Sequence, residues 1–127
     1  MKKLFTLINH NLLESQLAEA KEVLKIDEIV NLSDSTWASI DPYEEKVADK
    51  LNAYKKRLQD EAKNGDYLLV QGDFGATYSM VNFAFANDIV PIYATTKRVF
   101  NERIVDGKII ITREFIHARF RKYENEQ

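Results

Sequence analysis

Short apolar runs and longer amphipathic stretches alternate along the first 95 residues. The apolar runs predict four buried strands, over residues 2–8, 26–32, 66–71 and 89–95. The segments between them place apolar side chains at helical spacing and predict three helices, over residues 13–24, 41–63 and 76–86. The third of these helices is apolar nearly all round, so we expect it to be buried.

The start of the second helix has a clear sequence signal. Asp41 precedes Pro42, and Glu44 and Glu45 fall in the next turn. A capping residue, a proline at the first helical position and early acidic residues are together typical of a helix N-terminus. Asn64 and Gly65 are typical of its end.

The pattern changes after residue 96. Residues 98–115 alternate in polarity and turn at Asp106 and Gly107, which predicts a β-hairpin. The whole order predicts one α/β domain over residues 1–127, with a mostly parallel sheet, helices on both faces and a C-terminal antiparallel hairpin extension. We expect the last residues, from Lys122 on, to be frayed.

Composition narrows the class of protein. The chain has no cysteine, 45% hydrophobic and 30% charged residues, so nothing indicates an oxidising compartment. The first apolar run stops at Ile8, and no stretch is long enough to cross a membrane. These features predict a cytoplasmic protein without a membrane partner.

Charge is unevenly distributed. Residues 1–95 hold 10 Lys/Arg and 15 Asp/Glu, a net charge of −5, whereas residues 96–127 hold 8 and 5, a net charge of +3. An acidic body does not favour binding to long DNA, which needs a broad basic surface. A small anionic ligand near the C-terminal part is compatible with this distribution.

Polar residues follow each predicted strand. In an open parallel sheet, ligands bind beyond the carboxyl ends of the strands. The residues predicted to meet there are Asn9, His10, Asn11, Ser33–Trp37, Gln71, Gly72, Asp73, Phe74, Gly75, Thr77, Thr95, Thr96, Lys97 and Arg98. Amides, hydroxyls, two cations and a tryptophan suit a phosphate together with a nucleobase.

The stretch "GDFGAT" (72–77) has two interpretations. Its glycines let a backbone approach an anion at a helix N-terminus, or they serve only a tight turn. It is neither G-x-G-x-x-G nor a Walker A motif. Asp73 either caps the helix or bonds a ligand hydroxyl, since a carboxylate beside a phosphate is repulsive.

The other candidates also have structural alternatives. Lys97 and Arg98 suit a phosphate, or belong to a solvated loop. His10 either transfers a proton or is structural, and Trp37 either stacks on a base or covers the core. His117 lies in "HARFRKY" (117–123), which predicts a strand with one cationic face. Two distant histidines and no acidic loop pattern make a metal site improbable, so we expect no cofactor.

Several blocks of the sequence resemble a known family. "INHNLLESQLAEAK", "TWASIDP", "GDYLLVQGDFGATY", "PIYATTKR" and "HARFRKY", in this order, are similar to small CRISPR-associated Csx-type proteins, which resemble the stand-alone ring nucleases of type III CRISPR systems. The resemblance covers nearly the whole chain, and "VQGDFGATY" and "YATTKR" are its most specific blocks. It implies a Rossmann-like (CARF-like) fold, a homodimer, and degradation of cyclic oligoadenylate, with the four-membered ring as the first candidate, which switches off the antiviral response.

The residues themselves are compatible with this function. Attack by a ribose 2′-hydroxyl on the adjacent phosphate needs no metal and leaves linear products with 2′,3′-cyclic phosphate ends. The expected catalytic residues are His10, Asp73 and Arg98. Two alternatives stay open: a module that binds the ring without cleaving it, and a mononucleotide-binding enzyme.

Overall fold

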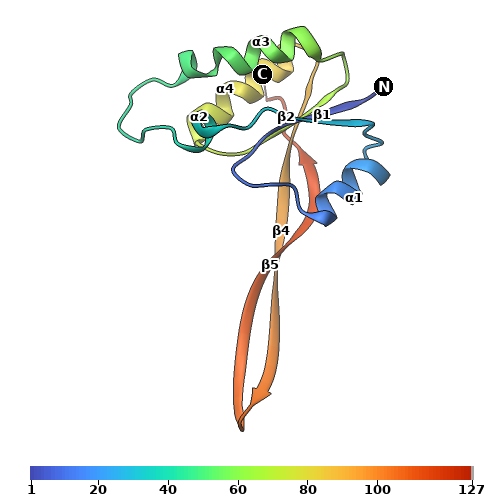
Figure 1. Cartoon of the computed structure of the whole chain (residues 1–127), viewed down its shortest axis with the longest axis vertical. Coiled ribbons are helices and arrows are strands. Elements are labelled where there is room, and N and C mark those ends of the chain that lie inside the picture. Colours follow the sequence, from blue (N-terminus) through green and yellow to red (C-terminus); the bar gives the residue numbers. More distant parts are fainter. Residues whose placement is uncertain (127) are drawn as a thin grey trace.

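The structure is a computed structural model, which describes residues 1–126. A five-stranded sheet carries helices on both faces, and its last two strands extend far beyond it (Figure 1). Its elements, in chain order, are β1 (Lys3–Leu7), α1 (Glu14–Glu22), β2 (Glu28–Asn31), α2 (Ser35–Ala38), the 3₁₀-helix η1 (Ala48–Leu51), α3 (Asn52–Glu61), β3 (Tyr67–Val70), α4 (Phe74–Ala86), β4 (Val90–Val105) and β5 (Lys108–Lys122).

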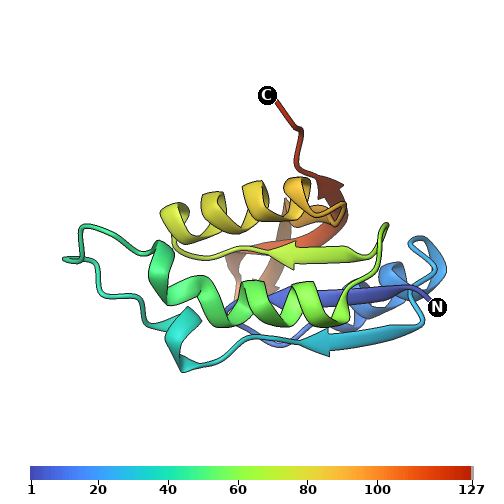
Figure 2. The ribbon, with the colours of Figure 1, turned by 90° about the horizontal axis from the view of Figure 1, so that it is seen from above.

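The strand order explains the layers. The sheet runs β2-β1-β3-β4-β5, with β1 to β4 parallel and β5 antiparallel to β4. The chain moves outward from β1 to β2, then crosses back over β1 to β3, so right-handed connections place helices on opposite faces. Figures 1 and 2 show α3 and α4 together on one face and α1 on the other. The expected α/β class, with a mostly parallel sheet and an antiparallel hairpin, is confirmed.

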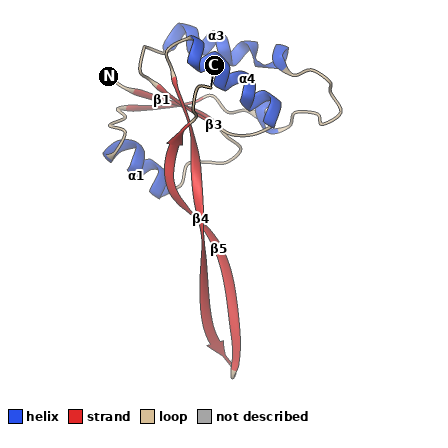
Figure 3. Ribbon diagram, turned by 180° about the vertical axis from the view of Figure 1, so that it is seen from behind, coloured by secondary structure: helices blue, strands red, loops and turns tan. Residues whose placement is uncertain are grey.

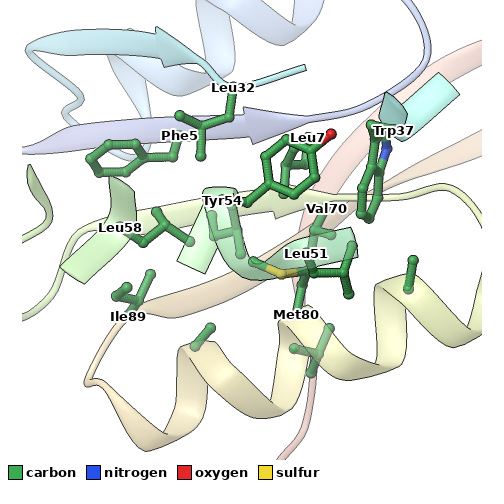
Figure 4. Close-up of a cluster of buried hydrophobic side chains, with 14 residues drawn as sticks. Phe5, Leu7, Leu32, Trp37, Leu51, Tyr54, Leu58, Val70, Met80 and Ile89 are labelled. Carbon is green, nitrogen blue, oxygen red and sulfur yellow. The ribbon is translucent and has the colours of Figure 1, made fainter. Parts of the chain in front are cut away.

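Each face of the sheet has its own core. On the side of α3 and α4, Phe5 and Leu7 of β1 meet Leu51, Leu58 and Met80, all almost fully buried (Figure 4). A smaller cluster under α1 includes side chains from the opposite face of the same strands and one from β5: Leu4, Ile8, Ala20, Ile26, Leu69, Ile92 and Phe120.

The predicted start of the second helix is wrong. Helical structure begins at η1, and Asp41 instead accepts a hydrogen bond from the backbone N–H of Tyr43 (2.9 Å) in a turn. Residues 41–46 are all exposed, so this segment has no apolar side to bury. A capping signal without a buried face is not sufficient to form a helix here.

The expected end of β4 near Thr95 is also wrong. The strand passes through a bulge between Thr95 and Thr96 and continues to Val105, paired with β5 throughout. Residues 96–117, from the pair Thr96–His117 to the turn at Asp106 and Gly107, form a two-stranded ribbon that we call the arm (Figure 3). The expected turn is confirmed, and both of its residues have positive φ.

A carboxylate of α1 holds the base of the arm. Glu19 lies with Oε1 2.6 Å from Nε2 of His117, and its two oxygens accept the backbone N–H of Phe120 at 3.0 and 2.8 Å. The His117 side chain is 3% exposed. Glu19 therefore joins α1 to β5 where the arm leaves the body.

We expect Glu19→Ala to lower the free energy of unfolding by about 1.5–3 kcal/mol, because hydrogen bonds to a charged group are lost and buried donors remain unpaired. Urea unfolding followed by circular dichroism measures this. Glu22→Ala is the matched control, since Glu22 is an exposed acid of the same helix. Equal stability of the two variants would contradict the anchoring role.

Candidate functional site

The turn after β3 is built around Trp37. Asp34 caps α2 by accepting the Trp37 backbone N–H (3.1 Å), and the indole Nε1 donates to the carbonyl of Gln71 (3.1 Å). The Trp37 side chain packs edge-on against Tyr54 and is only 2% exposed. Trp37 is thus a core residue, and its buried ring has no free face on which a nucleobase stacks.

Trp37 also explains one of the two glycines. A Cβ on Gly72 would lie 2.9 Å from the indole Nε1, too close for any side chain. A Cβ on Gly75 would meet only Asp73 at 3.5 Å and Val47 at 3.7 Å, which are ordinary contacts. Packing therefore requires Gly72 but not Gly75.

Asp73 is the N-cap of α4. Its Oδ2 accepts the backbone N–H of Ala76 (2.9 Å), and its carbonyl accepts the first helical bond, from Thr77 (2.8 Å). The N–H groups of Phe74 and Gly75 precede that first bond and have no partner inside the helix. The helix start keeps donors for a ligand, but the carboxylate occupies part of it.

An open cavity of about 470 Å³ lies beside this helix start. We call it the α4 cavity, and it is lined by Gln71, Gly72, Phe74, Thr77, Tyr78, Val81 and Tyr123. Phe74 and Tyr78, one helical turn apart, are 94% and 66% exposed. Thr77 adds a buried hydroxyl that has no hydrogen-bond partner among the described residues. The cavity is mostly apolar, with exposed rings at its border.

Tyr123 forms one wall of the α4 cavity. Its hydroxyl donates to the carbonyl of Val70 (2.7 Å), and burial, with a smaller contribution from Tyr93, raises the pKa of Tyr123 to about 12. The rings of Tyr93 and Tyr123 lie 4.6 Å apart, and Arg121 donates to the Tyr93 hydroxyl (3.0 Å). Together with Lys122 and Glu124, these three residues line a hollow of about 440 Å³ that shares Tyr123 with the α4 cavity, so the Arg121 guanidinium lies in the hollow next to the apolar cavity.

A second, polar cavity of about 360 Å³ lies at the ends of β1 and β2. It is lined by Ile8, Asn9, His10, Asn11, Asn31, Ser33, Asp34 and Ala38. His10 is exposed, with Nδ1 2.7 Å from the carbonyl of Asn11, so Nε2 faces no protein partner in the described chain. The short helix α2 separates this cavity from the α4 cavity, because Ala38 faces one and Trp37 packs against the turn of the other.

The predicted site residues thus fall into three groups. Asn9, His10 and Asn11 line the polar cavity, and Gln71, Gly72, Phe74 and Thr77 line the α4 cavity, whose helix Asp73 caps. The third group does not join them.

Thr95, Thr96, Lys97 and Arg98 lie within the continuous strand β4, not in a loop at its end. The Thr95 hydroxyl donates to the carbonyl of Arg119 (2.8 Å), and the Arg98 guanidinium lies over the ring of Phe115, 5.3 Å from its centre. The expected gathering of these residues around one phosphate at a strand end is wrong. Their roles in ligand binding stay predictions.

Three residues that line the α4 cavity were not predicted from the sequence: Tyr78, Val81 and Tyr123. The spacing of Phe74 and Tyr78 was available as a signal, since residues four apart share one helix face. Tyr123 was assigned to a frayed tail, and that prediction is wrong, because its hydroxyl is hydrogen-bonded and its ring packs on Tyr93.

Among residues 1–126, no group of three or more His, Asp or Glu side chains could hold a metal ion. Within the same residues, no helix is long and apolar enough to cross a membrane.

Sheet order and cavities define an open α/β protein with two candidate ligand sites at the carboxyl edge of its parallel strands. Residues 2–121 match the model of the uncharacterized protein MJ1673 family, and the chain belongs to that family. It is similar to the uncharacterized protein MJ1673 of Methanocaldococcus jannaschii, with 45% identity over 126 residues, which is 97% of this chain and 98% of that protein. No solved structure matches the chain.

The two glycines of the β3–α4 turn give a direct test of this geometry. We expect Gly72→Ala to lower the free energy of unfolding by about 1–3 kcal/mol, because the new methyl group overpacks against Trp37. Gly75→Ala is the matched control and leaves stability within about 0.5 kcal/mol. Urea unfolding followed by circular dichroism compares them, and an equal effect of both would show that Trp37 does not set the requirement.

Proposed function

We propose that the protein binds a cyclic oligoadenylate, with cyclic tetraadenylate as the first candidate, and cleaves it to linear products. The observation that carries the proposal is the pair of exposed rings, Phe74 and Tyr78, beside an open apolar cavity at a helix N-terminus. The biological role that goes with it is to end signalling by a type III CRISPR system, as a ring nuclease.

The α4 cavity suits a nucleobase. Its volume falls within the range of small-molecule sites, and aromatic faces bind bases by stacking whatever their sequence. The hydroxyl of Thr77, which is buried and has no partner among the described residues, would have to rotate into the cavity to bond a polar edge of the base. A ligand that covers Phe74 and Tyr78 would remove both apolar rings from water.

Phosphate groups of the same ligand have a different place. The carboxylate of Asp73 repels an anion from the centre of the helix start, while the N–H groups of Phe74 and Gly75 stay available on its rim. Arg121, held by Tyr93 beside the cavity, supplies a positive charge for a neighbouring phosphate. A ligand that alternates bases and phosphates matches an apolar cavity next to a cation.

Cleavage would proceed by in-line attack. The ribose 2′-oxygen bonds to the adjacent phosphorus as the bond from phosphorus to the 5′-oxygen breaks, which gives a 2′,3′-cyclic phosphate and a 5′-hydroxyl. The protein's main task is to hold these atoms in line. His10, with a free Nε2 in the polar cavity, is the candidate for proton transfer if the ring extends past α2.

One observation favours a second candidate function, binding without cleavage. The described residues that line the α4 cavity include no histidine, acidic or basic side chain. A module that sequesters the ring needs stacking and charge but no proton transfer. A mononucleotide-binding enzyme is the third candidate, and the same cavity would hold its base.

The decisive experiment is incubation of the pure protein with cyclic tri-, tetra- and hexaadenylate, with product masses resolved over time. We expect the tetramer to give linear products with 2′,3′-cyclic phosphate ends, and we expect cleavage to continue in excess EDTA. Tight binding with the ring left intact would favour the sequestering module, and no binding to any ring would contradict both. AMP serves as the mononucleotide comparison.

The aromatic pair gives a prediction for affinity. We expect Phe74→Ala and Tyr78→Ala each to weaken ring binding by about 1–3 kcal/mol, the usual value of one stacked base. Isothermal titration calorimetry measures the dissociation constant. Tyr43→Ala is the matched control, because Tyr43 is as exposed as Phe74 (94%) but lies in the loop before η1. A loss of affinity in the control as large as in Phe74→Ala would contradict the assignment.

The histidine gives a prediction for chemistry. We expect His10→Ala to slow cleavage by about 10²–10⁴-fold, the usual value of a positioned proton-transfer group, while binding changes little. Single-turnover rates with saturating protein separate the two effects. Near-native cleavage by the variant would show that orientation alone drives the reaction and that His10 is not catalytic.

A further inference from the structure

The arm is an unusual element for an isolated chain. Both strands are paired from Thr96–His117 to the turn, and the ribbon extends well away from the sheet and helices (Figures 1 and 3). Residues 100–111 are all exposed. A two-stranded ribbon without cover is at most marginally stable in water, so its length calls for a partner.

The pairing register separates the arm into two faces. Residues directly opposite each other in an antiparallel pair point to the same side, and alternate residues share a side. One side, which we call the apolar face, carries Arg98, Phe100, Glu102, Ile104, Ile109, Ile111, Arg113 and Phe115. Its five apolar side chains are 56–79% exposed, whereas Val105, Ile110 and Ile116 on the other side are about 40% exposed.

The exposed apolar area approaches that of a specific interface. Five large side chains that each leave on the order of 130 Å² in water present roughly 650 Å² per copy, close to the ~800 Å² per partner of a standard interface. Single chains rarely leave this much apolar surface uncovered on one face.

We infer that the apolar face of the arm packs against the same face of a second copy of this chain. The pattern of charges on that face supports a self-complementary contact. We call each pair of opposite residues on this face a row. Glu102 and Ile111 form a row near the tip, and Phe100 and Arg113 form the next row toward the body. None of the ion pairs among the described residues involves Glu102 or Arg113.

The positions of these charges also favour one relative orientation of the two arms. If the two arms run in opposite directions about a two-fold axis between these rows, the row that holds Glu102 in each copy packs against the row that holds the partner subunit's Arg113. The same packing sets Phe115 of one arm against Ile104 and Ile109 at the tip of the other. With the tips side by side, the two Glu102 side chains would lie in facing rows, as would the two Arg113 side chains, which is unfavourable. Ribbons that pack face to face with nearly aligned strands are a common arrangement.

The contact satisfies the rule for isologous dimers, in which each residue pair occurs twice. It also shields the aromatic rings that Arg98 and Arg113 already cover from one side, at 5.3 and 5.7 Å from the ring centres. The arm is then a dimerisation element.

The test uses the full chain without any ligand. Light scattering at about 50 µM should give twice 14.7 kDa for the native protein. Ile109→Asp, on the apolar face, should give a monomer or raise the dimer dissociation constant at least tenfold. Ile110→Asp, its neighbour on the other face, is the matched control and should stay dimeric.

A charge exchange tests the orientation. Glu102→Arg and Arg113→Glu should each weaken the dimer at least tenfold, and the double variant should recover most of the loss, because the pair is restored with its charges reversed. Circular dichroism confirms that each variant is folded. Failure of the double variant to recover would overturn the proposed alignment.

The outcomes separate this inference from the proposed function. A native chain that is monomeric without ligand overturns the arm contact. If a cyclic oligoadenylate then makes the chain dimeric, the arm contact is still overturned, but the ligand assignment is supported. Equal disruption by Ile109→Asp and Ile110→Asp would point to edge pairing of β5 and also overturn it. A dimer with the expected sensitivities stands whether or not any ring is bound.

Discussion

The packing of Trp37 against Gly72 is the contact on which the arrangement of the candidate site depends. It joins α2, which follows β2, to the turn between β3 and α4, and the indole hydrogen bond to the Gln71 carbonyl fixes the end of β3. Gln71 in turn accepts the backbone N–H of Ala94 with its side chain (2.8 Å), so the same turn is tied to β4. With the indole in place, two cavities remain separate on either side of α2.

The chemistry of the two cavities differs because the chain leaves β1 and β3 toward opposite faces of the sheet. The end of β1 is followed by amides and His10, which lie in the open and polar cavity. The end of β3 is followed directly by a helix whose exposed face begins with Phe74 and Tyr78. A purely polar or purely apolar ligand would use only one of these cavities. A nucleotide has both an apolar base, which fits the α4 cavity, and an anionic phosphate, which fits the neighbouring Arg121.

The local sequence pattern was sufficient to predict the sheet and most helices, because buried strands and amphipathic helices give a periodic spacing of apolar residues. It was insufficient where the structure of a segment depends on contacts with distant parts of the chain. Thr95–Arg98 looked like a loop because polar residues follow an apolar run, but pairing with β5 carries the strand on. Trp37 looked like a possible stacking surface, and only the position of Gly72 shows that the ring is enclosed. Tyr123 sits in a polar tail, and its burial depends on Tyr93, thirty residues earlier.

The proposed function depends on the α4 cavity holding the base of a nucleotide ligand. Titration of the ¹⁵N-labelled protein with cyclic tetraadenylate, with the backbone amide shifts followed by NMR, tests this directly. We expect the largest changes on residues 72–78 and on Arg121 and Tyr123, with small changes along the arm. Changes confined to the arm, or absent at saturating ligand, would contradict it.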